Sequence, residues 1–208
     1  NNTIIVLCAD HGDMLGERGQ WYKMTPFENS TRIPLIINHP EQKQTLRVIE
    51  NVSLVDLLPT LLDLGTHGKA LSENMLVEPI YGRSLRPLLE NQSTNWHDIA
   101  ISEMMFEGLT EPAIMIRKGR FKYIHINEST RLLFNMEEDP LELNDLSTDQ
   151  CLLKEIDDFQ NMIADGWDLE NINLFIRLDQ RRRNFIYSAH KVGRRPSWDF
   201  QPLSNASE

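Results

Sequence analysis

The segment IIVLCADHGD, residues 4–13, decides the fold. Residues 4–9 are apolar and β-prone without a polar interruption, which is typical of a strand buried on both faces within a parallel sheet. Two aspartates, a histidine and a glycine follow directly. Because open α/β sheets bind their ligands at the carboxyl ends of strands, we expect an α/β fold with a site loop beginning at Asp10.

Outward from this segment, the sequence predicts a second strand over residues 32–38 and a helix that ends at Gly65, with Ser53 as its N-cap. From residue 96 the pattern changes to short strands with Lys118-Gly119 as a hairpin turn, which indicates a small antiparallel sheet. These later strands are expected at residues 97–104, 113–117, 120–125 and 133–136. Helices are expected after residue 152, to about 163, and from 169 to about 189.

Composition limits the possible partners. The 208 residues carry a formal net charge of −10, which repels polyanions, so nucleic acid and anionic membranes are poor candidates. No apolar run approaches the roughly 20 residues needed to span a bilayer. Cys8 and Cys151 fit neither a disulfide scaffold nor a CxxC metal site. Because the chain opens directly on a core-like strand, without an initiator methionine, we expect a C-terminal fragment.

The loop after the first strand gathers groups that can bind a cation. Asp10, His11, Asp13 and Glu17 fall within eight positions. Carboxylate oxygens suit hard divalent cations, and an imidazole adds a neutral nitrogen ligand. On these residues alone, a metal that polarises an oxyanion and a simple solvated turn both remain open.

Longer sequence matches favour the metal site over the solvated turn. Residues 15–28, LGERGQWYKMTPFE, followed by RIPLII at 32–37, closely resemble the second metal-binding segment of sulfatases in the alkaline phosphatase superfamily. Residues 133–146, LFNMEEDPLELNDL, resemble a strand and turn near the C-terminus of that family. The tail RRPSWDFQP, residues 194–202, resembles the C-terminal extension of choline-sulfatases. The resemblance covers essentially the whole chain.

This resemblance implies the C-terminal part of an alkaline-phosphatase-like (sulfatase) fold. Residues 1–95 would complete the α/β core with the metal-binding loop, and residues 96–208 would form a C-terminal subdomain with strands, helices and a recognition tail. Asp10 and His11 would be ligands of one divalent cation, usually Ca²⁺ and in some relatives Mn²⁺ or Mg²⁺. Lys23 would contact a sulfate oxygen and, with His11, be catalytic. Glu17 and Arg18 are expected to hold the loop in shape.

The sequence departs from the family in one respect that matters for catalysis. Sulfatases attack sulfur with a formylglycine made within a C/S-x-P-x-R motif, and neither cysteine nor any serine of this chain lies in one. The paired aspartates that complete the family's metal site are also absent. We therefore expect the nucleophile upstream of these residues, and no sulfate ester hydrolysis by the 208 residues alone.

The tail resemblance implies choline O-sulfate as substrate. A quaternary ammonium is bound by aromatic faces and a carboxylate, and Trp198 and Asp199 place both side by side, with Glu103 expected in the same pocket. Alternatively, Trp198 pins the tail to the body. The family resemblance also implies a homo-oligomeric complete enzyme in the cytoplasm.

Two other functions stay open on the sequence. A broader-specificity sulfatase or a phosphonate or phosphodiester hydrolase would share the Asp-His-Gly segment, and only the tail separates them from a choline-sulfatase. A non-catalytic remnant module is the alternative from a different class. A metal titration separates it from a half-site, because two protein ligands bind Ca²⁺ weakly and a self-sufficient module binds it tightly.

Overall fold

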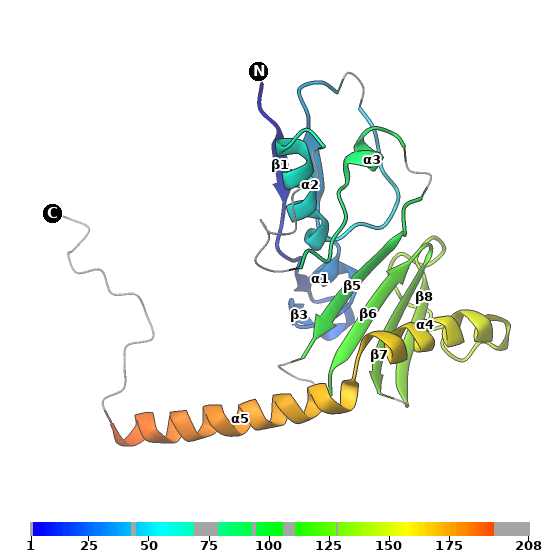
Figure 1. Ribbon diagram of the computed structural model, residues 1–208. Coiled ribbons are helices and arrows are strands. Elements are labelled where there is room, and N and C mark those ends of the chain that lie inside the picture. The colour runs from blue at the N-terminus through cyan, green and yellow to red at the C-terminus, as the bar shows by residue number, and fades with distance from the viewer. Residues whose placement is uncertain are drawn as a thin grey trace. The chain divides into compact units, whose positions relative to one another are not determined.

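The computed structural model describes residues 2–42, 45–68, 79–92, 95–105, 111–127 and 129–193 (Figure 1). Its contacts divide the chain into two compact units, Asn1–Gly166 and Trp167–Glu208. The boundary predicted at residue 95 concerns a subdivision within the first unit and stays a prediction.

The first unit begins with short elements. Its strands and helices up to residue 89 are β1 (Ile5–Cys8), β2 (Met14–Leu15), the 3-10 turn η1 (Glu17–Gly19), β3 (Trp21–Tyr22), α1 (Glu28–Thr31), β4 (Leu35–Asn38), η2 (Leu54–Asp56), α2 (Leu57–Gly65) and α3 (Arg86–Leu89). The rest consists of β5 (Ile99–Met104), β6 (Ala113–Lys118), β7 (Phe121–Asn127), β8 (Thr130–Asn135), η4 (Gln150–Leu152) and α4 (Leu153–Gly166). The second unit contains α5 (Leu169–Val192).

The helix predicted to start after Ser53 and end at Gly65 is confirmed as η2 followed by α2. Ser53 and Asp56 form a capping box, in which the Ser53 amide donates to Asp56 Oδ2 at 2.8 Å. Asp56 is buried and also accepts a hydrogen bond from the Arg83 amide at 2.9 Å. One carboxylate therefore binds backbone amides of two separate chain segments. Pro59 lies in the first turn of α2, where its missing donor costs no helical hydrogen bond.

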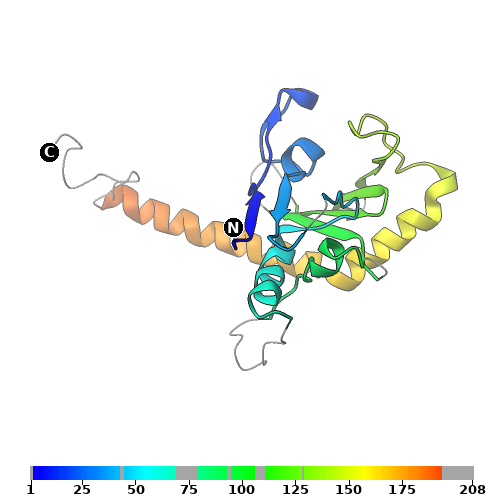
Figure 2. The ribbon, with the colours of Figure 1, turned by 90° about the horizontal axis from the view of Figure 1, so that it is seen from above.

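The first strand is not buried on both faces, and this prediction was wrong for the present chain. β1 pairs antiparallel with β4, as Figure 2 shows, and the described sheet contains these two strands alone. The side chains of Ile5 and Leu7 are 57% and 53% exposed. The physical reason is that the described residues provide no layer over the face of β1 that carries Ile5 and Leu7. An apolar strand sequence indicates what a strand can bury, and burial itself requires a covering layer.

The predicted antiparallel sheet is confirmed, with strand order β5-β6-β7-β8. Gly119 has a φ of 53° and closes the β6–β7 hairpin, a left-handed position at which glycine avoids strain. On one face, Met115, Ile124 and Phe134 form a core cluster that also packs against Phe27. On the other face, the ring of Tyr123 stacks on Phe159 of α4 with 5.2 Å between centroids.

The second unit is a long helix without a buried side chain among its described residues. Asp168 caps α5 by accepting a hydrogen bond from the Asn171 amide at 3.0 Å. The large apolar side chains of α5 include Phe175 and Leu178, and both are exposed. Within the described part of the chain, no helix is long and apolar enough to cross a membrane.

Candidate functional site

The structure brings together the three residues assigned to the site loop. Nζ of Lys23, which follows β3, lies 2.9 Å from Nε2 of His11, which follows β1. Because an ammonium can only donate, Nε2 is the acceptor, and the imidazole proton belongs on Nδ1. Nδ1 lies 2.8 Å from the Gly12 carbonyl, which accepts it. Asp10 Oδ2 lies 3.4 Å from the same Nε2, so a carboxylate, an imidazole lone pair and an ammonium converge at one point.

Helix α1 holds the two loops that carry these groups. The Gly12 amide donates to the Ser30 carbonyl at 2.8 Å, and a Cβ at Gly12 would lie 2.0 Å from the Asn29 carbonyl oxygen. The backbone of α1 therefore passes directly against Gly12, and only glycine fits there. The buried Ser30 hydroxyl donates to the Lys23 carbonyl at 2.7 Å. One helical turn thus fixes the backbone next to His11 and at Lys23.

Glu17 and Arg18 stabilise the intervening loop, as expected. The Leu15 amide donates to Glu17 Oε2 at 2.6 Å, and this hydrogen bond lowers the pKa of the Glu17 carboxyl. The Arg18 guanidinium lies 4.0 Å from the ring centroid of Phe27 and 5.6 Å from that of Phe134, in cation–π contact with both. Tyr22 has a φ of 68°, so left-handed backbone immediately precedes Lys23.

Asp10 and His11 fit part of a cation site. The exposed Asp10 Oδ2 lies 3.4 Å from His11 Nε2, and the two atoms would be ligands of one ion once the Lys23 ammonium no longer donates to that nitrogen. Ca²⁺ takes six to eight oxygen ligands. Within the ranges that the structure describes, no group of three or more His, Cys, Asp or Glu side chains could hold a metal ion. The donor set of these residues is therefore suited to complete a cation site together with further ligands.

One further predicted site residue, Glu103, lies within the described part of the chain. Glu103 is exposed near the end of β5, in a different sheet from the strands that flank Asp10. Trp198 and Asp199 lie outside the described residues. The roles assigned to these three residues stay predictions.

Sequence reasoning missed a buried charge cluster behind α1. Nζ of Lys122, on β7, lies 3.0 Å from Glu28 Oε1 and 2.8 Å from Glu142 Oε1. We call these three residues the Lys122 triad. The Lys122 side chain is fully buried. Only one signal was available, a lysine within the apolar strand sequence FKYIHI, and its partners lie too far away in the chain to be identified from it.

A further cation faces this cluster. Arg117 of β6 is the register partner of Lys122 across the β6–β7 ladder. Burial lowers the pKa of the Arg117 guanidinium, and the negative charge of Glu28 opposes that shift. Glu28 therefore interacts with two cations from neighbouring strands, Lys122 and Arg117.

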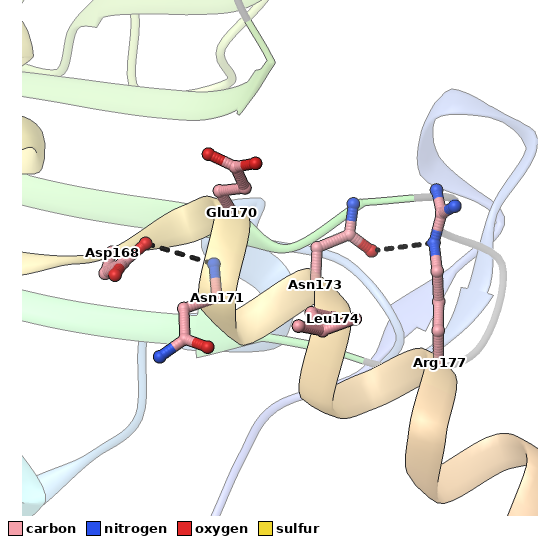
Figure 3. Close-up of a pocket in the computed structure, with 6 residues that line it drawn as sticks. All are labelled: Asp168, Glu170, Asn171, Asn173, Leu174 and Arg177. Carbon is pink, nitrogen blue, oxygen red and sulfur yellow. Dashed lines mark hydrogen bonds between the residues drawn. The ribbon is translucent and has the colours of Figure 1, made fainter.

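Two surface hollows are lined by other parts of the chain. One of about 540 Å³ lies along the first turns of α5, where Asp168, Asn171, Asn173 and Arg177 satisfy one another by hydrogen bonds (Figure 3). A second, of about 340 Å³, lies between the β6–β7 hairpin and α4 and includes Asp98, Arg120 and Asp158 in its lining. Neither contains a residue predicted for the site.

Comparison with known proteins gives consistent matches. Residues 16–165 match the family described as "N-sulphoglucosamine sulphohydrolase, C-terminal", and residues 176–208 match "Choline sulfatase enzyme C terminal". A choline-sulfatase from Rhizobium meliloti (strain 1021) is 38% identical over all of this chain and 40% of its own length. The chain therefore spans less than half of that relative.

Solved structures agree with these matches. A 2-O GAG sulfatase shows a TM-score of 0.65 and 29% identity, over 78% of this chain and 35% of its own. A phosphonate monoester hydrolase from Silicibacter pomeroyi shows a TM-score of 0.63 and 26% identity, over 77% of this chain and 34% of its own. The chain thus spans about a third of either structure. The family match over residues 16–165 includes Lys23 and begins after Asp10 and His11.

Proposed function

The chain belongs to the sulfatase family, and from that premise we propose that it is the C-terminal part of a sulfuric ester hydrolase acting on choline O-sulfate. The observation that carries the proposal is the convergence of Lys23 Nζ and Asp10 Oδ2 on His11 Nε2, at 2.9 and 3.4 Å. The match of this whole chain to 40% of a choline-sulfatase and the match of residues 176–208 to the choline-sulfatase C-terminus support the choice of substrate.

Lys23, Asp10 and His11 have different roles in this proposal. The Lys23 ammonium binds a sulfate oxygen and stabilises negative charge that develops on it as the ester bond breaks. Asp10 and His11 complete the coordination of a divalent cation, Ca²⁺ in our proposal, which when bound would polarise a sulfate oxygen. The Nδ1 hydrogen bond to the Gly12 carbonyl fixes the ring of His11 with Nε2 directed at the site.

Sulfatases are generally metal-dependent and use formylglycine as nucleophile. No C/S-x-P-x-R motif occurs in these 208 residues, so we propose that the formylglycine is supplied from outside them. Under this proposal, the 208 residues alone release no sulfate. They bind Ca²⁺ weakly, because Asp10 and His11 offer only part of the ligands that Ca²⁺ takes.

Recognition of the choline end is assigned to the tail. We propose that Trp198 covers the trimethylammonium group with its ring while Asp199 and Glu103 supply negative charge. The same proposal describes the complete enzyme as a cytoplasmic homo-oligomer.

The test uses the chain joined to a nucleophile-bearing upstream segment, and compares sulfate release from choline O-sulfate and from an aryl sulfate. We expect a strong preference for choline O-sulfate. Trp198→Ala should raise KM for choline O-sulfate about 2- to 30-fold, the equivalent of one cation–π contact, and leave the aryl ester unaffected. Asp199→Ala should act in the same direction, with Ser197→Ala as the neutral neighbour control. Equal or better hydrolysis of the aryl ester would remove the choline assignment.

A phosphonate monoester hydrolase activity is the second candidate, favoured by the structural similarity to such an enzyme. The ammonium and cation ligands described above stabilise an oxyanion on phosphorus as well as one on sulfur. A phosphonate monoester is therefore the third substrate in the same assay. Turnover of that ester above both sulfates would replace the first proposal by the second.

A further inference from the structure

The Lys122 triad ties the four-stranded sheet to α1. Lys122 projects from β7, Glu28 is the first residue of α1, and Glu142 lies in the segment after β8. Lys122 is fully buried and Glu142 is 3% exposed. Lys122 and Glu28 stand 94 positions apart in sequence, so this contact is a tertiary link between distant segments.

Glu142 also binds the backbone at the start of α1. Its Oε2 accepts a hydrogen bond from the Glu28 amide at 2.8 Å, while its Oε1 lies 2.8 Å from Lys122 Nζ. The residue at the N-cap position of α1, Phe27, offers no side-chain cap. Glu142 therefore caps α1 from a distance, and the ion pair with Lys122 holds that cap in place.

Helix α1 depends on such support because it has only four residues. Helix nucleation is unfavourable, and one turn is not stable by itself in water. The contacts that hold α1 come from the sheet side: the triad, the 3.4 Å contact of Lys122 Nζ with Thr31 Oγ1, and the edge-on packing of Phe27 against Phe134.

The same turn fixes the site loop from its other side. Gly12 donates to the Ser30 carbonyl and has no room for a Cβ, and the Ser30 hydroxyl holds the Lys23 carbonyl. A displacement of α1 would therefore shift the backbone beside His11 and at Lys23 together. A continuous chain of contacts runs from β7 through α1 to the two loops that meet at His11.

We propose that Lys122, Glu28 and Glu142 are positioning residues, which set the relative placement of His11 and Lys23 by fixing α1 against the sheet. The proposal rests on the proposed function only in calling that loop catalytic. A buried ion pair adds little net stability over apolar packing, but the hydrogen bonds that Lys122 Nζ donates to Glu28 Oε1 and Thr31 Oγ1 are directional. A fully buried lysine that bridges two carboxylates specifies one placement of α1, whereas apolar side chains would allow it to slide.

The test measures hydrogen exchange at the Gly12 amide relative to the amides of β6 and β7. We expect Glu142→Gln, which keeps the shape of the side chain and removes its charge, to raise Gly12 exchange at least about tenfold more than exchange in the two strands. Lys122→Met should have the larger effect, and Lys122→Arg should restore most of the protection. Glu142→Gln decides the question if Lys122→Met does not fold.

Ile163→Val is the matched control, because Ile163 is buried in α4, the helix whose Phe159 stacks on Tyr123, on the opposite face of the sheet from Lys122. It should raise Gly12 exchange no more than strand exchange. The proposal would be overturned if Glu142→Gln raised hydrogen exchange equally at Gly12 and in the strands, or left exchange at Gly12 unchanged.

Kinetics supply an independent readout. In the form that hydrolyses a sulfate ester, Glu142→Gln should lower kcat at least about tenfold with KM within about twofold, because substrate contacts remain and their alignment is lost. If that form hydrolyses no sulfate ester, the function proposed above fails, and the exchange measurement still decides the role of the triad.

Discussion

Two pairs of apolar strands in this molecule have opposite environments. In β1, Ile5 and Leu7 are more than half exposed, whereas Ile116 of β6 and Ile124 of β7 are at most 1% exposed. β1 is the more apolar segment, because β6 and β7 also contain charged residues, so the difference in exposure comes from what covers the strands. The four-stranded sheet has Phe159 of α4 stacked on one face and Phe27 packed on the other. The site loop thus follows β1, the more exposed strand. It is held in place by contacts that run through α1 to the four-stranded sheet.

The uncovered strands indicate where further structure would add stability. Covering a large aliphatic side chain contributes about 1.5–3 kcal/mol. Under the proposed function, the remaining part of the sulfatase fold packs on the exposed side chains of β1 and β4. The present chain then supplies a rigid sheet and a loop that the rest of the enzyme completes.

The largest contrast between the regions is expected from phenylalanine truncation. Phe134→Ala should lower the free energy of unfolding by about 3–5 kcal/mol, because its ring is buried in the sheet core and packs against Phe27. Phe185→Ala on α5 is the matched control, since that ring is 77% exposed, and should change stability by less than about 0.5 kcal/mol. Urea unfolding measures both. Similar effects at the two sites would mean that the sheet core is not where the stability resides.

A smaller and more local effect is expected at Gly12. Gly12→Ala would place a Cβ 2.0 Å from the Asn29 carbonyl oxygen and force α1 and the loop apart, at a cost of about 1–3 kcal/mol. Hydrogen exchange should increase at α1 and the loop while β6 and β7 keep their protection. Gly166→Ala is the control, because no atom lies within 4 Å of its added Cβ. Exchange that rises in the strands as well would show that the two regions unfold as one.

The smallest effect is expected from acid. The hydrogen bond from the Leu15 amide keeps the pKa of Glu17 below its ordinary value of 4.5. A lowered folded-state pKa stabilises the loop above the unfolded-state pKa, and this contribution is lost as the pH falls through the folded-state pKa. The Leu15 amide should therefore lose protection below pH 4.5 before the sheet does. Glu17→Gln removes this pH dependence, and an unchanged acid response in that variant would assign it to another group.

Local signals in the sequence predicted much of this structure. Ser53 marks the start of the helix because capping depends on neighbouring residues, and Lys118-Gly119 marks the hairpin because glycine tolerates a positive φ. Gly65 is the last helical residue, and Thr66 rather than Gly65 is the C-cap. The site loop was predicted from the residues after the first strand and from a family resemblance that identified Lys23.

Features that depend on distant segments were not predictable in this way. The exposure of β1 depends on which layers cover it, and its antiparallel pairing depends on β4, some 30 residues later. The Lys122 triad joins residues from three separate segments of the chain, and the need for glycine at position 12 arises from the backbone of α1. No local pattern encodes such contacts.

We propose above that Lys23, held beside His11, acts on a sulfate ester. The most direct test is the turnover of choline O-sulfate by Lys23→Ala in the form of the enzyme that carries the nucleophile. Lys154→Ala is the matched control, because that lysine is 86% exposed on α4. The account expects kcat/KM to fall about 100- to 1,000-fold in Lys23→Ala, as on removal of an oxyanion donor, and to stay unchanged in Lys154→Ala. Undiminished turnover in Lys23→Ala would contradict it.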